Sequence, residues 1–266
     1  MNKTHFLRYN LVWLASLQIG FAAFELHMTT PIMYNINFSN FFGNTVLSKE
    51  YSFVYTYSNL YGLPSLKLSS WDLYLPFSNI HTCFSHQSFG NKRYQETISS
   101  VSINIALNPR LRMWGNIHLF ALSIPSYGNA QTMGLSLRMR FQATRSVWWG
   151  AAFQNVGGST IGKSNDIIPQ NISVVLGFVP LEYVSTAIVW LQDISLSDCS
   201  GIAAVKTTFT PSKRISITTG YINIPVQINV GAQLSLSKLS ISYIINYHVE
   251  IERLSSFIGL DLGWDF

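Results

Sequence analysis

Apolar and polar residues alternate one by one along most of this chain. Residues 133–141 read Met-Gly-Leu-Ser-Leu-Arg-Met-Arg-Phe, and residues 226–234 read Val-Gln-Ile-Asn-Val-Gly-Ala-Gln-Leu. A period of two places all apolar side chains on one face of a β-strand. The pattern predicts about fourteen strands of roughly ten residues and therefore an all-β fold. Their predicted ranges are 50–57, 66–75, 79–89, 94–107, 111–123, 132–141, 147–156, 172–180, 182–193, 201–210, 214–222, 226–236, 238–248 and 255–265.

The last predicted strand has the clearest alternation and ends the chain. Leu260, Leu262, Trp264 and Phe266 alternate with glycine and aspartate residues. A strand with lipid on one side and a wet lumen on the other has this dyad pattern. The sequence therefore predicts a transmembrane antiparallel β-barrel surrounded by outer-membrane lipids. We expect the outer-membrane assembly machinery to recognise its aromatic C-terminal strand.

The links between the predicted strands alternate in length. Every second link is tight, as at 108–110 and 211–213, and the intervening links tend to be longer, as at 157–171. Two of the intervening links, 90–93 and 223–225, are also short. Short periplasmic turns and longer outer loops are typical of outer-membrane barrels. An even number of strands then places both termini in the periplasm.

The composition favours a membrane protein that has been exported. Residues 1–22 have a basic start, an apolar run and small residues near their end, which predicts a cleaved signal peptide, with a single membrane anchor as the alternative. Beyond them no run of 18 or more apolar residues predicts a helical span. Only 11% of the residues are charged, against about 25% in a typical globular domain. The predicted location is the bacterial cell outer membrane.

Between the signal peptide and the predicted barrel of residues 50–266 lies an N-terminal segment, residues 23–49. It is rich in Asn, Thr, Phe and Met. Fourteen strands enclose a lumen wider than that of a side-chain-filled eight-stranded barrel. A segment of this size fits a partial plug, and a periplasmic tail or an extra strand remains an alternative.

Polar side chains on the strands indicate which residues line the lumen. The candidates are Arg138, Arg140, Asp261, Asn246 and His248. Charges inside a barrel pair with one another or tune which solutes pass. Both a structural salt-bridge network and a solute-selecting role remain open for the arginines.

Aromatic residues gather at the ends of the predicted strands. Barrels carry aromatic girdles at both membrane interfaces. The sequence accordingly predicts interface positions for Trp114, Trp148, Trp149, Trp264 and Phe266.

The sequence gives little support for nucleic-acid binding, metal or cofactor binding, or catalysis. The basic residues are scattered, although the formal net charge is +5, so nucleic-acid binding is not predicted. No metal-ligand spacing, phosphate loop or nucleophile elbow occurs, so neither metal nor cofactor is expected. His86 and Ser88 share a strand face, as in a lipid hydrolase, but no orienting third group accompanies them. The chain is therefore not predicted to be an enzyme.

Three short strings resemble the PorV/PorQ group of FadL-like barrels. They are Gln154–Gly158, Gly220-Tyr221 followed by Pro225, and Tyr243–His248. The resemblance implies a fourteen-stranded barrel with an N-terminal segment in or near the lumen. It also implies either transport of hydrophobic compounds or an accessory role in type IX protein secretion. The chain lacks the Ala/Gly-rich N-terminus and the Asn-Pro-Ala element of that group.

The leading functional hypothesis is a FadL-like channel for small hydrophobic compounds. The alternatives are an accessory or docking barrel of type IX secretion, with secretion-system proteins as partners, and an outer-membrane lipid hydrolase. A lateral gap between strands, or a lumen lined with apolar groups, would favour the channel.

Overall fold

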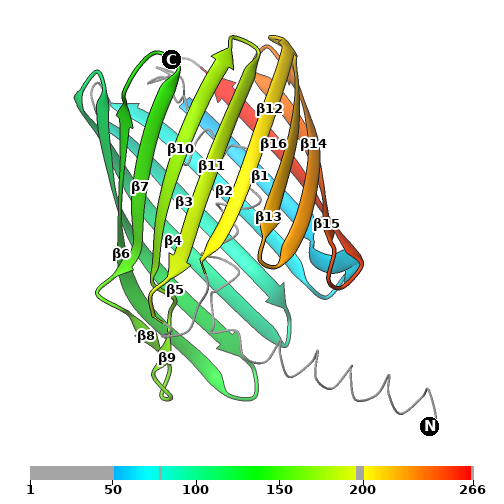
Figure 1. The fold of residues 1–266 in the computed structure, drawn as a ribbon. Coiled ribbons are helices and arrows are strands. Elements are labelled where there is room, and N and C mark those ends of the chain that lie inside the picture. Colours follow the sequence, from blue (N-terminus) through cyan, green and yellow to red (C-terminus); the bar gives the residue numbers. More distant parts are fainter. Residues whose placement is uncertain (1–50, 78–79, 196–200, 265–266) are drawn as a thin grey trace.

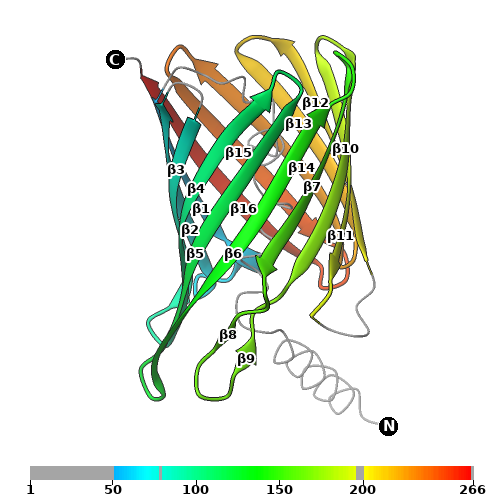
Figure 2. The same ribbon diagram turned by 90° about the vertical axis from the view of Figure 1, so that its left-hand side faces the viewer.

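A computed structural model describes residues 51–77, 80–195 and 201–264, which form one closed β-barrel (Figures 1 and 2). Fourteen strands follow one another around the barrel in the order β1-β16-β15-β14-β13-β12-β11-β10-β7-β6-β5-β4-β3-β2. The predicted signal peptide 1–22, the segment 23–49 and Phe266 lie outside the described residues. The barrel strands are β1 Tyr51–Asn59, β2 Lys67–Phe77, β3 Ile80–Asn91, β4 Tyr94–Asn108, β5 Leu111–Ile124, β6 Gly128–Gln142, β7 Val147–Val156, β10 Asn171–Leu181, β11 Val184–Asp193, β12 Ile202–Ser212, β13 Ile215–Asn223, β14 Val226–Leu236, β15 Leu239–His248 and β16 Arg253–Trp264.

The all-β, antiparallel barrel expected from the alternation is confirmed, and each predicted strand corresponds to an observed one. β14 has the predicted bounds. The largest difference is in β6, which begins at Gly128 rather than at residue 132. Residues 128–131 have no apolar alternation, and they are extended because they pair with β5, where Ile124 lies opposite Gly128.

The two faces of the barrel wall differ in polarity. On β4 the side chains of Val101, Ile103 and Ile105 are exposed, whereas those of Ser100 and Asn104 are buried. In a closed barrel, the exposed apolar row points outward and the alternate row points inward. An outward face of this kind requires surrounding lipid, because in water this large apolar surface would remain exposed to the solvent. The fold is therefore a transmembrane β-barrel. Among the described residues, no helix is both long and apolar enough to span a bilayer.

The links between strands differ in length at the two ends of the barrel, and we name the two ends accordingly. The short-turn end is the end at which β16 finishes, at the top of Figure 1. The opposite end is the long-loop end, and it carries the one-turn helix η1 (Leu60–Gly62) and a small hairpin of β8 (Thr160–Ile161) and β9 (Asp166–Ile167). The links at the short-turn end include 109–110, 143–146, 182–183, 213–214 and 237–238, and those at the long-loop end include 60–66, 92–93, 125–127, 157–170, 224–225 and 249–252.

Closure of the barrel depends on its first and last strands. β1 pairs with β16 along its whole length, from Tyr51 opposite Trp264 to Asn59 opposite Ser256. The rings of Tyr51 and Trp264 stack with their centroids 6.2 Å apart. Pairing of the two chain-terminal strands leaves the sheet without an open edge that could pair with another chain.

Candidate functional site in the barrel interior

The inner wall carries hydrogen-bonded polar side chains. His118 on β5 lies between two hydroxyls, with Nδ1 2.6 Å from Ser100 Oγ and Nε2 2.8 Å from Ser136 Oγ. The register places Ser100 directly opposite His118, whereas Ser136 is the next inward residue along β6 after Gly134, which lies opposite His118. The bridge ties β4, β5 and β6 together.

A second polar group lies on the inner wall of β14, β15 and β16. Asn246 Nδ2 donates to Gln227 Oε1 over 2.6 Å, and His248 Nε2 lies 2.9 Å from Ser255 Oγ. All four side chains are buried. The two predicted lumen residues of this region, Asn246 and His248, therefore face inward and bind neighbouring strands.

Charged residues gather toward the short-turn half of the interior. Arg138 and Arg140 on β6 point inward, and Arg140 lies directly opposite Arg112 on β5. Arg138 interacts electrostatically with Asp72 on β2, although three strands separate β2 from β6 in the barrel order. Asp261 lies inward on β16, in one register row with Val54. The interior thus has basic residues on the β5–β6 wall and acidic residues on the walls of β2 and β16, and further inward charges are Glu96 on β4 and Lys206 on β12, opposite Ala187.

We expect Asp72 and Arg138 to stabilise the barrel as a pair. Replacing either alone leaves a charge in the interior without this partner, whereas replacing both removes the interaction. The double-mutant cycle of Asp72→Asn and Arg138→Gln should give a coupling of about 0.5–3 kcal/mol in the free energy of unfolding. Denaturant titration of the refolded variants in detergent micelles measures it. Strictly additive effects would contradict the interaction.

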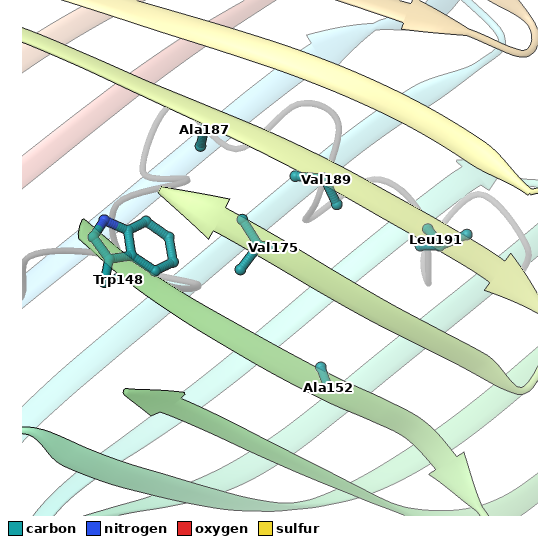
Figure 3. Packing of buried hydrophobic residues seen from close by; sticks show 6 residues of the cluster. All are labelled: Trp148, Ala152, Val175, Ala187, Val189 and Leu191. Atoms are coloured by element: carbon teal, nitrogen blue, oxygen red, sulfur yellow. The ribbon is translucent and has the colours of Figure 1, made fainter. Parts of the chain in front are cut away.

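One sector of the interior is apolar rather than polar. Inward side chains of β7, β10 and β11 form a buried cluster, and Ile202 and Ala204 of β12 pack against it (Figure 3). We call these residues the apolar inner patch. Three register rows carry it, one of which runs from Gly150 through Val175 and Val189 to Ala204. The cluster residues are Trp148, Ala152, Val175, Ala187, Val189 and Leu191.

Trp148 anchors this patch near the short-turn end. Its ring lies over Gly177, where an added Cβ would be only 1.9 Å from Trp148 Cε2. The guanidinium of Arg140 lies 4.6 Å from the centroid of the indole ring. The same guanidinium donates to Gln142 Oε1 over 2.8 Å. The patch therefore borders directly on the basic wall, so apolar and cationic surfaces meet at one point of the interior.

The structure corrects two of the aromatic positions. Trp149 and Trp264 lie on outward rows, but Trp114 pairs with Arg138 and therefore lies on the inward face, as does Trp148. Both corrected residues stand beside tight turns, where sequence position alone cannot tell the inward row from the outward one. Phe266 lies outside the described residues.

At the long-loop end, the link between β1 and β2 folds back over the inner wall. Leu60 of η1 is buried with Leu68, Phe89, Ile244 and Phe257. The adjacent Tyr61 N–H donates to Ser255 Oγ over 2.8 Å, and its ring lies 4.6 Å from that of His248. Burial raises the pKa of Tyr61 above its ordinary value of 10.0. This link therefore covers part of the interior at this end.

The apolar inner patch was not predicted as a site. Its signal was nevertheless present, because the predicted strand 182–193 is apolar on both faces. A strand whose inward row is also apolar must meet other apolar residues inside the barrel. Which residues these are depends on the pairing with β7, β10 and β12. Among the described residues, no cluster of His, Cys, Asp and Glu could hold a metal ion.

The comparisons with known proteins agree with this geometry at the level of the fold. The P. putida toluene transporter TodX superposes with a TM-score of 0.58 at 9% identity, over 82% of this chain and 90% of TodX. The fold is similar to that of TodX. The CymD monoaromatic hydrocarbon channel superposes with a TM-score of 0.54 at 8% identity, over 80% of this chain and 87% of CymD. No family model matches the chain, and no curated protein matches it significantly in sequence.

Proposed function

We propose that the protein is a channel of the bacterial outer membrane that passes small hydrophobic compounds. The observation that carries this proposal is the apolar inner patch. A lumen that passes only polar solutes does not require an apolar sector. Ligand sites for such compounds are lined mainly by apolar and aromatic side chains. The structural similarity to TodX, a toluene transporter, and to CymD, a monoaromatic hydrocarbon channel, supports the same class of solute.

The patch supplies a continuous path of low polarity across β7, β10 and β11 on the inner wall. Trp148 offers an aromatic face at one end, and Leu191 and Ile202 offer aliphatic groups toward the long-loop end. An apolar solute on this path replaces contact with water by contact with side chains, at about 25 cal/mol for each Å² that is buried.

Two further parts of the proposal concern the chain outside the barrel wall. Residues 23–49 would act as a partial plug, since they join β1 at the short-turn end of the lumen and are rich in Phe and Met. The aromatic C-terminal strand would serve recognition by the outer-membrane assembly machinery, and outer-membrane lipids would surround the apolar outside.

The test is uptake of toluene by cells that produce the protein and have no other hydrocarbon channel. Val189→Asn places an amide in the centre of the patch, and its desolvation should lower the initial uptake rate about tenfold, equivalent to about 1.4 kcal/mol. Ser185→Asn is the matched control, because it adds a similar group to the same inward row of β11, outside the patch. It should leave uptake unchanged.

Uptake that is equal to that of cells without the protein would overturn the proposal. A barrel that folds, reaches the outer membrane and yet transports no hydrocarbon would favour the accessory role in secretion that the PorV/PorQ resemblance implies. Equal rates for the Val189→Asn and Ser185→Asn variants would show that the solute takes another path.

A further inference from the structure

The link of residues 157–170 between β7 and β10 is a folded hairpin. We call it the latch loop. β8 and β9 pair within it, with Thr160 opposite Ile167, and three of its glycines have positive φ angles. Figure 2 shows this hairpin at the long-loop end, below β6 and β7. This link, one of the longer links predicted from the sequence, is therefore a compact element with a defined position.

Two isoleucines hold the latch loop against the inner wall. Ile161 is 2% exposed and Ile168 is 0% exposed, and both pack with Ile98 of β4 and Phe120 of β5. The wall residues belong to inward rows, so the loop lies on the lumen side of the barrel. The neighbouring Ile167 is 45% exposed and points away from this cluster. One side of the hairpin therefore packs against the inner wall, and the other side is exposed.

Asn155, the residue before the end of β7, fixes the base of the latch loop. Its Nδ2 donates to the Ile168 carbonyl over 2.9 Å, and its own carbonyl accepts from Gln170 Nε2 over 3.0 Å. Gly134 on β6 lies next to Asn155 and Phe120. A Cβ added at Gly134 would be 2.7 Å from the Phe120 ring and 2.8 Å from Asn155 Oδ1. The absence of a side chain at position 134 lets the loop approach this closely.

The latch loop also completes a part of the wall that β7 does not reach. The ladder between β6 and β7 ends with Leu135 opposite Val156, although β6 begins at Gly128. The carbonyl of Met133 in this segment accepts a hydrogen bond from Ser159 of the loop. The base of the loop therefore takes the place of a strand neighbour at this edge.

We infer that the latch loop is a gate at the long-loop end of the lumen, and that a small apolar solute opens it. In the closed state Ile161 and Ile168 occupy an apolar site on Ile98 and Phe120. A solute that binds this site replaces the isoleucine side chains, and the loop leaves the wall. The role of the solute rests on the proposed function, whereas the latching itself does not.

Limited trypsin digestion of the folded protein in detergent micelles tests the gate. Lys163 is exposed in the turn between β8 and β9, and cleavage after it requires the hairpin to open locally. Ile168→Ser removes the anchor and should raise the cleavage rate at Lys163 about tenfold. Ile167→Ser makes the same change on the free side and should leave the rate unchanged. Ile161→Ser is the second anchor variant, should Ile168→Ser fail to fold.

Toluene is the probe for the opening step. At saturation it should accelerate cleavage of the native protein at Lys163 several-fold and leave the already released Ile168→Ser variant unaffected. Cleavage at Lys92, in the link between β3 and β4, reports any general effect of the solvent and should not change. Equal cleavage of Ile168→Ser and Ile167→Ser would overturn the latch, and an unaltered native rate in toluene would overturn its opening by solute. If cleavage responds while cells take up no toluene, the gate stands and the proposed transport fails.

Discussion

Leu137→Arg should destabilise the barrel by about 2–4 kcal/mol, the cost of a charged side chain on the lipid face near the bilayer midplane. Leu137 lies in the middle of the outward row of β6, between Leu135 and Met139, and is 45% exposed. Its register neighbours Gly115 and Phe153 are also outward, so no polar group nearby could satisfy the guanidinium. The side chain must either lose its hydration or draw water and headgroups into the membrane.

Denaturant titration of protein refolded into phospholipid bilayers measures this change in the free energy of unfolding. Tyr127→Arg is the matched control, because Tyr127 is 89% exposed in the turn between β5 and β6 and lies beyond the apolar row. It should alter the free energy by less than about 0.5 kcal/mol. An equally small effect of Leu137→Arg would contradict the assignment of this face to lipid.

Gly177→Val should cost about 1–3 kcal/mol, because the added side chain cannot coexist with the Trp148 ring. The first added carbon alone would lie 1.9 Å from Cε2 of the indole. The ring must therefore leave Gly177 and lose its contact with the Arg140 guanidinium. The change also fills the end of the apolar inner patch, so toluene uptake should fall together with stability.

Two variants separate this clash from a general effect of valine in a strand. Gly115→Val lies on the outward face of β5, where an added Cβ meets nothing within 4 Å, and should be neutral or slightly stabilising. Combining Gly177→Val with Trp148→Ala should cost less than the sum of the single changes, because the smaller residue removes the clash. Additive losses would show that the ring is not the cause.

Strand positions could be predicted well from the sequence because lipid outside and water inside impose a period of two on every spanning strand. In residues 226–236 the predicted and observed bounds coincide. The prediction was less accurate where neither environment acts strongly on the side chains, as at the start of β6, whose polar residues beyond the apolar row are held by backbone pairing with β5.

Individual aromatic residues were harder to place. Trp148 and Trp149 are adjacent, so one must face inward and the other outward, and both stand next to a tight turn. The indole ring suits a membrane interface and a packed lumen wall equally well. Pairing with β10 decides between them, because Gly177 offers Trp148 a bare backbone surface inside the barrel.

The position of the latch loop likewise could not be predicted from the local sequence. Its glycines and polar residues indicate a turn-rich link, and nothing local shows that Ile161 and Ile168 will meet Phe120, some forty residues earlier in the chain. The contact exists because the pairing of β7 with β6, and of β6 with β5, brings the end of β7 close to Phe120, and because Gly134 leaves room there.

The sequence by itself therefore determined the all-β class, the strand positions, the alternation of lipid-facing and lumen-facing residues, and the two kinds of link. These properties follow from the solvent, lipid or water, that each side chain contacts. This contact determines the local alternation of apolar and polar residues. Only the tertiary structure decided the order of neighbours around the barrel, the apolar inner patch and the docked latch loop. They depend on the register between strands, which joins residues that are distant in the chain and leaves no local pattern.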